Sequence, residues 1–350
     1  MTDLAACYVL HQKQDIRREE RPIREPLPGH VLIRMKRMGI CGSDMHYYQD
    51  GHLGTFIPTR PFVLGHEGFG EIAAVAADVT NLQPGTRVAI DPARPCGACR
   101  FCRTGRDNLC PSTSYLGSAA TVPPTDGLFR EYMAFPAPNC HPLPDEIDDA
   151  AAAMIEPLAV AMHAVRQAGT ISGARVLVTG GGAIGQLILA VARAYGASTL
   201  ALSDPIAGRR AFAVETGAQI ALDPTSQDAV GEALRASNGG FDLAFEASGA
   251  PPALRQALHL LRPGGTVVQV GSLPAEVEVP GNLIMKRELR LVGSFRFAYV
   301  FPAAIELAAS GRIDLKRLVT RTFPLDQFDA AMSTALSRDA AIKVHLTTDA

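Results

Sequence analysis

The stretch Thr179-Gly-Gly-Gly-Ala-Ile-Gly185 lies between an apolar run at residues 175–178 and a segment with helical periodicity at residues 187–195. A chain that passes so abruptly from a strand to a helix, through several glycines, is typical of a dinucleotide-binding turn. The glycines and the first residues of the helix form the predicted cofactor-binding turn: Gly180, Gly182, Ala183, Ile184 and Gly185.

Each of the three spaced glycines has a separate predicted role. Gly180 takes the tight turn, Gly182 lets the backbone approach a pyrophosphate, and Gly185 allows the helix to pack close to the strand. The phosphates would then face the positive end of the helix. Three glycines in a turn can also be an ordinary turn, so the interpretation depends on the sequence around them.

A second apolar run, residues 199–203, is followed by Asp204, roughly 20 residues after the glycines. Dinucleotide-binding folds have an acidic residue at this point that accepts hydrogen bonds from the ribose hydroxyls. A carboxylate there repels a ribose 2′-phosphate, so we expect NAD in preference to NADP. Arg209 and Arg210 keep NADP open, because a guanidinium can pair with that phosphate. Alternatively, both arginines lie on the solvated face of the next helix.

The size and composition of the chain indicate a globular protein of two domains. It has 350 residues, 47% hydrophobic and 19% charged, with a formal net charge of -2. The near-neutral charge argues against a nucleic-acid or anionic-membrane partner. No run approaches the ~18 apolar residues of a membrane span, and the N-terminus lacks a targeting pattern. We therefore expect a cytoplasmic protein.

The order of apolar runs predicts two kinds of architecture along the chain. The first ~150 residues read as β-rich, with short runs punctuated by proline and glycine. A helix is expected over 150–167, and a tail from about residue 297, with a helix over 303–309, returns to the first domain. Between them, apolar runs alternate with helical segments and predict a parallel sheet covered on both faces: residues 176–180, 199–203, 220–223, 242–246, 266–270 and 289–295.

Four of the seven cysteines crowd into residues 96–110 and point to a metal site. Four thiolates close a tetrahedral site, which is typical of structural zinc. The alternative of four buried thiols without a metal does not explain why they crowd into so short a segment. The net charge disfavours a zinc module that binds nucleic acid. Cys7 and Cys140 are isolated and expected to be inert. The predicted structural ligands are Cys96, Cys99, Cys102 and Cys110.

A second metal site is predicted from Cys41 and His66, each flanked by glycine on a loop edge. A thiolate and an imidazole suit zinc and leave a position open for water or substrate. Taken singly, such residues are more often a buried thiol and a hydrogen-bonded histidine. Glu67 and Glu156 are both candidates for the third ligand, and Glu156 interrupts an apolar helix start, where an unpaired carboxylate is costly.

With these motifs in place, the chain resembles the zinc-dependent medium-chain alcohol dehydrogenases from end to end. Within that family, residues 41–48, 156–163 and 293–297 resemble the polyol branch. The motifs that carry the wider resemblance are Gly-Ile-Cys-Gly-Ser-Asp-Met-His at 39–46, Gly-His-Glu at 65–67, the four-cysteine lobe, Glu156-Pro and the glycine turn.

The resemblance implies an α/β fold with a Rossmann domain, a doubly wound parallel sheet, and a GroES-like β-rich catalytic domain. The predicted bounds are 153–296 for the Rossmann domain, and 1–152 with 297–350 for the catalytic domain, with the active site in the cleft between them. The implied residues are Cys41, His66 and a glutamate on the catalytic zinc, Ser43 and His46 in a proton relay, and Tyr47, Phe56 and Arg296 lining the pocket.

The implied reaction is oxidation by NAD of a secondary hydroxyl of a sugar acid or polyol to a ketone. Residues 116–119 and 293–297 favour L-idonate, giving 5-dehydro-D-gluconate, with sorbitol and then a threonine-type substrate as alternatives. A protein that holds zinc and NAD without turnover is a further alternative. A zinc-free quinone reductase would leave Cys41 and His66 without a role. The family likeness also implies a homo-oligomer, a tetramer or a dimer.

Overall fold

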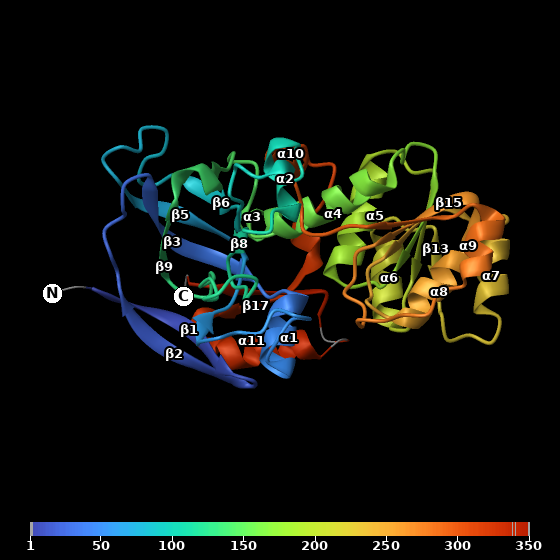
Figure 1. The fold of residues 1–350 in the computed structure, drawn as a ribbon, viewed down its shortest axis with the longest axis horizontal. Helices are drawn as coiled ribbons and strands as arrows, with labels where there is room; N and C mark the ends of the chain where they lie inside the picture. Colours follow the sequence, from blue (N-terminus) through green and yellow to red (C-terminus); the bar gives the residue numbers. More distant parts are fainter. Residues whose placement is uncertain (1–2, 338, 340, 349–350) are drawn as a thin grey trace. The chain divides into compact units, whose positions relative to one another are not determined.

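The computed structural model describes residues 3–337, 339 and 341–348, which form two compact units. Unit 1 comprises Met1–Glu156 and Phe301–Ala350, and unit 2 comprises Pro157–Val300. In Figure 1, unit 1 therefore combines the blue start of the chain with its red end. The sequence predicts these boundaries after residues 152 and 296. Residues 1–2, 338, 340 and 349–350 of the predicted catalytic domain lie outside the described part.

A six-stranded parallel sheet forms the frame of unit 2, in the order β13-β12-β11-β14-β15-β16. Val176, Leu177 and Val178 on β11 are fully buried, because both faces of a central parallel strand are covered. The strand order reverses between β11 and β14, where sheets of this kind bind ligands at their carboxyl ends. The strands are β11 (Arg175–Thr179), β12 (Thr199–Ser203), β13 (Ile220–Leu222), β14 (Phe241–Glu246), β15 (Leu261–Gln269) and β16 (Arg290–Gly293).

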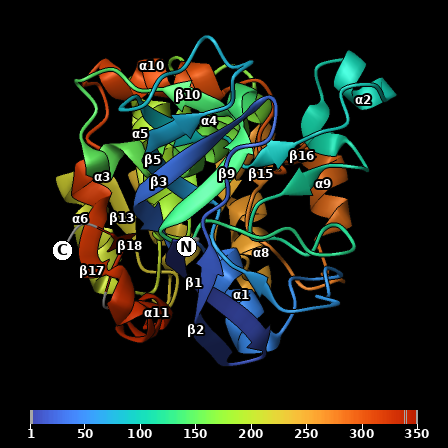
Figure 2. The same ribbon diagram turned by 90° about the vertical axis from the view of Figure 1, so that its left-hand side faces the viewer.

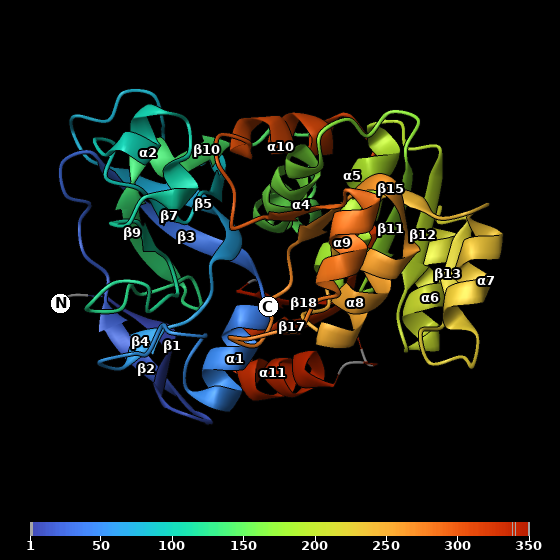
Figure 3. The ribbon, with the colours of Figure 1, turned by 45° about the vertical axis from the view of Figure 1, so that its right-hand side comes forward.

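Helices cover both faces of this sheet (Figure 3). Leu177, Ala201 and Ala244 pack in one apolar cluster with Ala233 of α7 and Leu254 of α8, so these helices share a face. The crossovers through α5 and α6 run along the sheet in the opposite direction and cover the other face. The helices are α5 (Ala183–Ala194), α6 (Ala207–Glu215), α7 (Ala229–Ala236), α8 (Pro251–Leu260) and α9 (Gly281–Arg287). The predicted Rossmann architecture is confirmed.

A seven-stranded sheet forms the frame of unit 1, in the order β10-β6-β5-β3-β18-β17, with β9 also paired to β3. Figure 2 shows β3, β5 and β9 side by side. Strand β18 pairs with β3, so segments about 300 residues apart in the sequence share this sheet; Leu346, for example, lies opposite Met38. Its strands are β3 (His30–Gly39), β5 (Glu67–Val75), β6 (Arg87–Ile90), β9 (Tyr132–Pro136), β10 (Cys140–Pro142), β17 (Val319–Pro324) and β18 (Lys343–Thr347).

Smaller elements complete unit 1 around a core that includes Val31, Ile33, Phe62 and Phe328. A three-stranded sheet contains β1 (Leu4–Gln12), β2 (Asp15–Pro22) and β4 (Phe62–Val63), and β7 (Ala93–Arg94) pairs with β8 (Ser114–Tyr115). The helices are α1 (Gly42–Asp50), α2 (Arg100–Arg103), α3 (Asp149–Ala152), α10 (Phe301–Ala309) and α11 (Phe328–Leu336), with 3-10 turns at Asp107–Leu109, Ala137–Asn139, Lys316–Leu318 and Leu325–Gln327.

The helix predicted over 150–167 is interrupted: α3 ends at Ala152, and α4 runs from Ile155 to Ala168. Pro157 explains the break, because proline has no N–H to donate to the carbonyl of Ala153 in a continuous helix. In the first turn of a new helix the missing N–H has no consequence. The break places Glu156 in the first turn of α4.

None of the helices in the described ranges combines the length and the apolar character needed to cross a lipid bilayer.

Candidate active site

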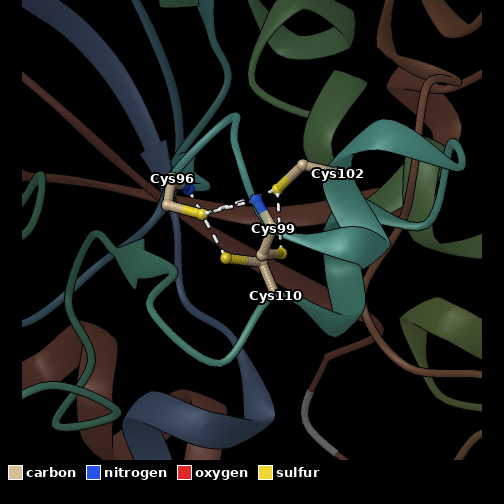
Figure 4. A group of neighbouring side chains, drawn as sticks. All are labelled: Cys96, Cys99, Cys102 and Cys110. Carbon is tan, nitrogen blue, oxygen red and sulfur yellow. Dashed lines mark hydrogen bonds between the residues drawn. The ribbon is translucent and has the colours of Figure 1, made fainter.

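The four cysteines predicted as structural ligands converge in a lobe between β7 and the segment after α2 (Figure 4). Figure 2 shows the part of this lobe around α2 standing away from the seven-stranded sheet. Cys96 and Cys99 lie before α2, Cys102 lies within it, and Cys110 follows the turn Asp107–Leu109. The ligand atoms all lie within 4.8 Å of one another.

The spacing of the sulfurs fits a tetrahedral zinc. Sγ of Cys99 lies 3.5 Å from Sγ of Cys102, and Sγ of Cys96 lies 3.9 Å from it. Zinc–sulfur bonds of about 2.3 Å at tetrahedral angles place the sulfurs about 3.8 Å apart. The backbone N–H of Cys96 donates to Sγ of Cys110 at 3.4 Å, which favours a thiolate there. The donors and their separations therefore suit a closed structural site.

Cys41, His66 and Glu67 form a second group of possible metal ligands, with ligand atoms within 4.8 Å of one another. Cys41 is the N-cap of α1, His66 directly precedes β5, and Glu67 is the first residue of β5. His66 and Glu67 are buried, whereas Cys41 is partly exposed. One thiol, one imidazole and one carboxylate with an accessible side form the donor set of an open zinc site.

A buried carboxylate that the sequence analysis did not single out holds these ligand segments together. Asp44 is fully buried and accepts hydrogen bonds from the backbone N–H of Cys41, at 2.9 Å, and of Gly65, at 3.1 Å. Its Oδ1 also lies 3.8 Å from Nδ1 of His66. Asp44 is the third residue of α1 and reaches back to the N-cap residue, the pattern of a capping box. That spacing was the signal available in the sequence.

The surroundings of the candidate site favour a positive charge. Although burial lowers the pKa of His66, the nearby Cys41, Asp44 and Glu156 raise it to about 10. Burial raises the pKa of Glu156 to about 7, against the attraction of His66. A cluster of anionic groups that stabilises an imidazolium can stabilise a metal cation in place of the proton. This electrostatic preference agrees with zinc at Cys41 and His66.

Of the two glutamates considered as third ligand, Glu67 belongs to the compact ligand group and Glu156 does not. Glu156 is 4% exposed, and its Oε1 accepts a hydrogen bond from the Tyr115 hydroxyl at 2.6 Å. The ring of Tyr115 also lies against His66, with centroids 5.6 Å apart. The geometry favours Glu67 as the ligand, with Glu156 held nearby by Tyr115. Tyr115 was missed because its partner is 41 residues away in sequence.

Ser43 and His46, the predicted relay pair, both lie on α1 at a spacing of three residues. Side chains at that spacing share a helix face. Ser43 is partly exposed and His46 exposed, and Nδ1 of His46 lies 2.9 Å from Oδ2 of Asp50. The pair therefore lies on an accessible face of the helix that begins at Cys41.

Tyr47, predicted to line the pocket, lies instead in the core. Its side chain is fully buried, its ring packs edge-on against Phe62, and its hydroxyl accepts the N–H of Ala119 at 2.9 Å. The helical period explains this, because Asp44 and Tyr47 occupy the inward face of α1. Phe56 is partly buried at the edge of the same apolar core and bridges to Leu53.

Arg296 follows β16 in unit 2, in an unusual backbone conformation. Its φ is 52°, in the left-handed region that arginine seldom adopts. The guanidinium lies over the ring of Phe295, 4.8 Å from the centroid. A non-glycine residue held in this conformation is often functional.

The three glycines of the turn differ in whether the backbone conformation and packing require a glycine there. Gly180 has a φ of 97°, and a Cβ there would lie 2.7 Å from the backbone nitrogen of Ser248. A Cβ on Gly185 would collide with the backbone of Gly180. Gly182 has a φ of -71°, and a Cβ there would meet no atom within 4 Å beyond its chain neighbours. The fold therefore explains Gly180 and Gly185, whereas Gly182 leaves open space at the N-terminus of α5.

Asp204 follows β12 and turns toward the glycine turn. It is 3% exposed and accepts the N–H of Gly181 at 2.6 Å. Nη1 of Arg209 lies 3.6 Å from its Oδ2. Arg210 donates to the backbone oxygens of Asp204 and Pro205 and pairs with Asp223 at 2.9 Å. Arg210 thus has a local structural role, and Arg209 is the arginine beside the acid.

Two family models match the chain: the alcohol dehydrogenase GroES-like domain over residues 27–145, and the zinc-binding dehydrogenase over residues 183–310. Sorbitol dehydrogenase of Gallus gallus is 39% identical, over 98% of this chain and 96% of that protein. This chain belongs to the zinc-dependent medium-chain dehydrogenases.

Other members of the zinc-dependent medium-chain dehydrogenases also match over nearly the full length. A probable D-xylulose reductase A of Aspergillus terreus is 40% identical, over 93% of each chain. The solved structure of L-idonate 5-dehydrogenase from Escherichia coli superposes with a TM-score of 0.93 at 35% identity, covering 99% of both chains. The chain is accordingly a polyol or sugar dehydrogenase that uses zinc and a nicotinamide cofactor.

The two zinc sites are expected to differ in how firmly they hold the metal. The purified protein should contain about two zincs per chain, and a chelator should remove one much faster, because the four-thiolate site has no vacancy for an incoming ligand. Metal analysis after timed dialysis against a chelator measures this. One zinc per chain in fully active protein would contradict the two-site assignment.

The glycine turn gives a second prediction. Gly182→Ala should leave the melting temperature within about 2 °C of the wild type, since its backbone suits alanine. It should weaken NADH binding by about tenfold or more, because the methyl group occupies the space next to the pyrophosphate. Gly185→Ala should instead destabilise the fold. Fluorescence titration and thermal melts distinguish the two, and Gly208→Ala, which has open space in α6, is the control.

Proposed function

We propose that this dehydrogenase oxidises L-idonate at its 5-hydroxyl to 5-dehydro-D-gluconate with NAD. The observation that carries the proposal is Arg296, held at a φ of 52° at the end of β16. A sugar acid has a carboxylate remote from its reacting hydroxyl, and a guanidinium recognises a carboxylate through paired hydrogen bonds. The 0.93 TM-score to the idonate enzyme of Escherichia coli supports the same substrate.

Sorbitol is the second candidate, favoured by a different observation. The relative from Gallus gallus that carries the name sorbitol dehydrogenase is 39% identical to this chain. Arg296 would then donate hydrogen bonds to neutral hydroxyl groups instead of a carboxylate. A threonine-type substrate would require only a different pocket on the same catalytic residues.

For the metal, the proposed ligands are Cys41, His66 and Glu67, with Glu156 held beside them by Tyr115. When bound, zinc supplies a Lewis acid that lowers the pKa of an alcohol. Asp44 keeps the segments of Cys41 and His66 in place through its two backbone hydrogen bonds. The ligand set therefore needs little rearrangement, because buried hydrogen bonds already fix its backbone.

For the proton, we propose that Ser43 accepts one from the substrate hydroxyl as it passes its own to the nicotinamide ribose, and that the proton reaches solvent through His46. Both side chains lie on the accessible face of α1, and His46 is 54% exposed. An exposed histidine suits this task, because an imidazole ring can accept a proton at one nitrogen and release one from the other. Asp50 at 2.9 Å orients the imidazole.

For the cofactor, we propose NAD over NADP, held by the turn at 180–185 and by Asp204. NAD supplies the hydride acceptor when bound. The buried carboxylate of Asp204 lies at the turn, whereas the donors of Arg210 are engaged by Asp223 and the backbone. Asp204 would accept hydrogen bonds from the ribose and repel a 2′-phosphate. The ratio of kcat/KM for NAD and NADP tests this, and a preference for NADP would assign the phosphate to Arg209.

We further propose a homo-oligomer, a tetramer or a dimer, in the cytoplasm. Strand β16 is an edge strand of the six-stranded sheet. Exposed apolar side chains lie on this strand and on the segments next to it in the sequence. A second copy could cover them, which sedimentation velocity would detect. A reducing compartment suits seven free cysteines. The exposed side chains are Met285 (66%), Leu291 (46%), Phe295 (46%) and Tyr299 (65%).

The substrate assignment predicts a selective effect of removing Arg296. In Arg296→Ala, kcat/KM for L-idonate should fall. The fall should correspond to a loss of about 2 kcal/mol or more of transition-state stabilisation, the scale of a charged hydrogen bond, and the loss for sorbitol should be smaller. The measurement is kcat/KM for L-idonate, sorbitol and L-threonine with NAD, in wild type and variant.

Arg290→Ala removes an exposed arginine from β16 and serves as the matched control, with no expected change. A wild type that prefers sorbitol, or equal losses for both substrates, would make this protein a sorbitol dehydrogenase and leave the metal and cofactor assignments unchanged.

A further inference from the structure

Lys343 is a buried lysine next to the candidate zinc site, and the function described so far gives it no role. It begins β18, is 4% exposed, and its Nζ donates to the backbone oxygen of Ile40 at 3.0 Å. The same ammonium forms an ion pair with the carboxylate of Glu67, which is 1% exposed. Burying a lysine costs free energy unless its charge is paired, and the ion pair with Glu67 supplies that partner.

The register of the sheet explains how the pair is accommodated. His345 of β18 lies opposite Gly39 of β3, and Gly39 lies opposite Glu67 of β5. Gly39 therefore leaves a gap in this cross-strand row. A Cβ there would lie 2.9 Å from Cε of Lys343 and would collide with the carboxylate of Glu67. The gap is filled by the two charged side chains, one from each neighbouring strand.

The charges of the site show what the lysine can do. Three buried carboxyl groups lie near His66, on Asp44, Glu67 and Glu156, together with the thiol of Cys41. Lys343 contributes a fixed positive charge, and it contacts the one carboxylate that belongs to the ligand group.

We propose that Lys343 is a positioning residue that sets how Glu67 binds the catalytic zinc. The ammonium occupies one oxygen of Glu67, which leaves a single oxygen for the metal and offsets one negative charge of the site. Glu67 would then offer one oxygen to a bound metal and would hold it less strongly than a carboxylate with both oxygens available. Without the lysine, Glu67 would bind through both oxygens and more strongly.

This inference rests on the proposed zinc site at Cys41, His66 and Glu67, and it is independent of the substrate. It also differs from a purely structural role, in which Lys343 only ties β18 to β3 through Ile40. A lost structural tie would loosen the site and speed the release of zinc. A lost competitor for Glu67 would slow it. The direction of the change therefore distinguishes the two roles.

The test measures zinc release from the intact enzyme to a chromogenic chelator, with the four-thiolate site as a slow internal reference. In Lys343→Gln, which keeps a hydrogen-bond donor but removes the charge, release from the faster site should slow by about tenfold or more, given the energy of one charge at close range. Lys343→Met should behave in the same way. Lys343→Arg keeps the charge and should restore the wild-type rate.

Lys316→Gln removes an exposed lysine of unit 1 and is the matched control, with no expected change. Release that is unchanged or faster in Lys343→Gln, with an unaltered slow phase, would overturn the role of Lys343. Equal slowing in Lys343→Arg would overturn it too. A wild type that holds one zinc per chain would instead refute the zinc site itself, so the two failures are distinguishable.

Discussion

The candidate site depends on one buried carboxylate, that of Asp44. Its two oxygens accept the backbone N–H groups of Cys41 and Gly65, which belong to separate segments of the chain. A buried carboxylate that lost either partner would be left with an unsatisfied charge, which is far more costly than an ordinary broken hydrogen bond. The two segments are therefore held at a fixed separation, and the side chains of Cys41 and His66 converge because their backbones cannot move apart.

The division of the chain separates two tasks. The candidate metal ligands and their supporting residues lie in unit 1, whereas the glycine turn and Asp204 lie in unit 2. Each task uses a different kind of backbone. The candidate metal ligands lie at the start of an antiparallel strand and at the N-terminus of a helix. The cofactor turn follows the carboxyl end of a parallel strand.

Much of this arrangement is predictable from sequence because the decisive patterns are local. The glycines at 180–185 and the cysteines at 96–110 are close in sequence, and their spacing alone indicates a turn and a tetrahedral site. The helical period puts Tyr47 on the same inward face as Asp44, where its side chain is fully buried, and the family likeness gave no sign of this. Lys343 and Tyr115 escaped notice because strand register and tertiary packing join them to glutamates distant in sequence.

Strand β18 is synthesised long after the candidate metal ligands Cys41, His66 and Glu67, because it lies far from them in the sequence. The four thiols of the lobe all lie within residues 96–110, so these proposed ligands are all present once this short segment has emerged from the ribosome. The other ligand group is complete in sequence by Glu67, but its sheet lacks β18 and the cation on Lys343 until residues 343–347 have been synthesised. A chain that stops before residue 343 would therefore contain every candidate metal ligand but lack the strand and the ammonium group that contact Glu67 and its sheet.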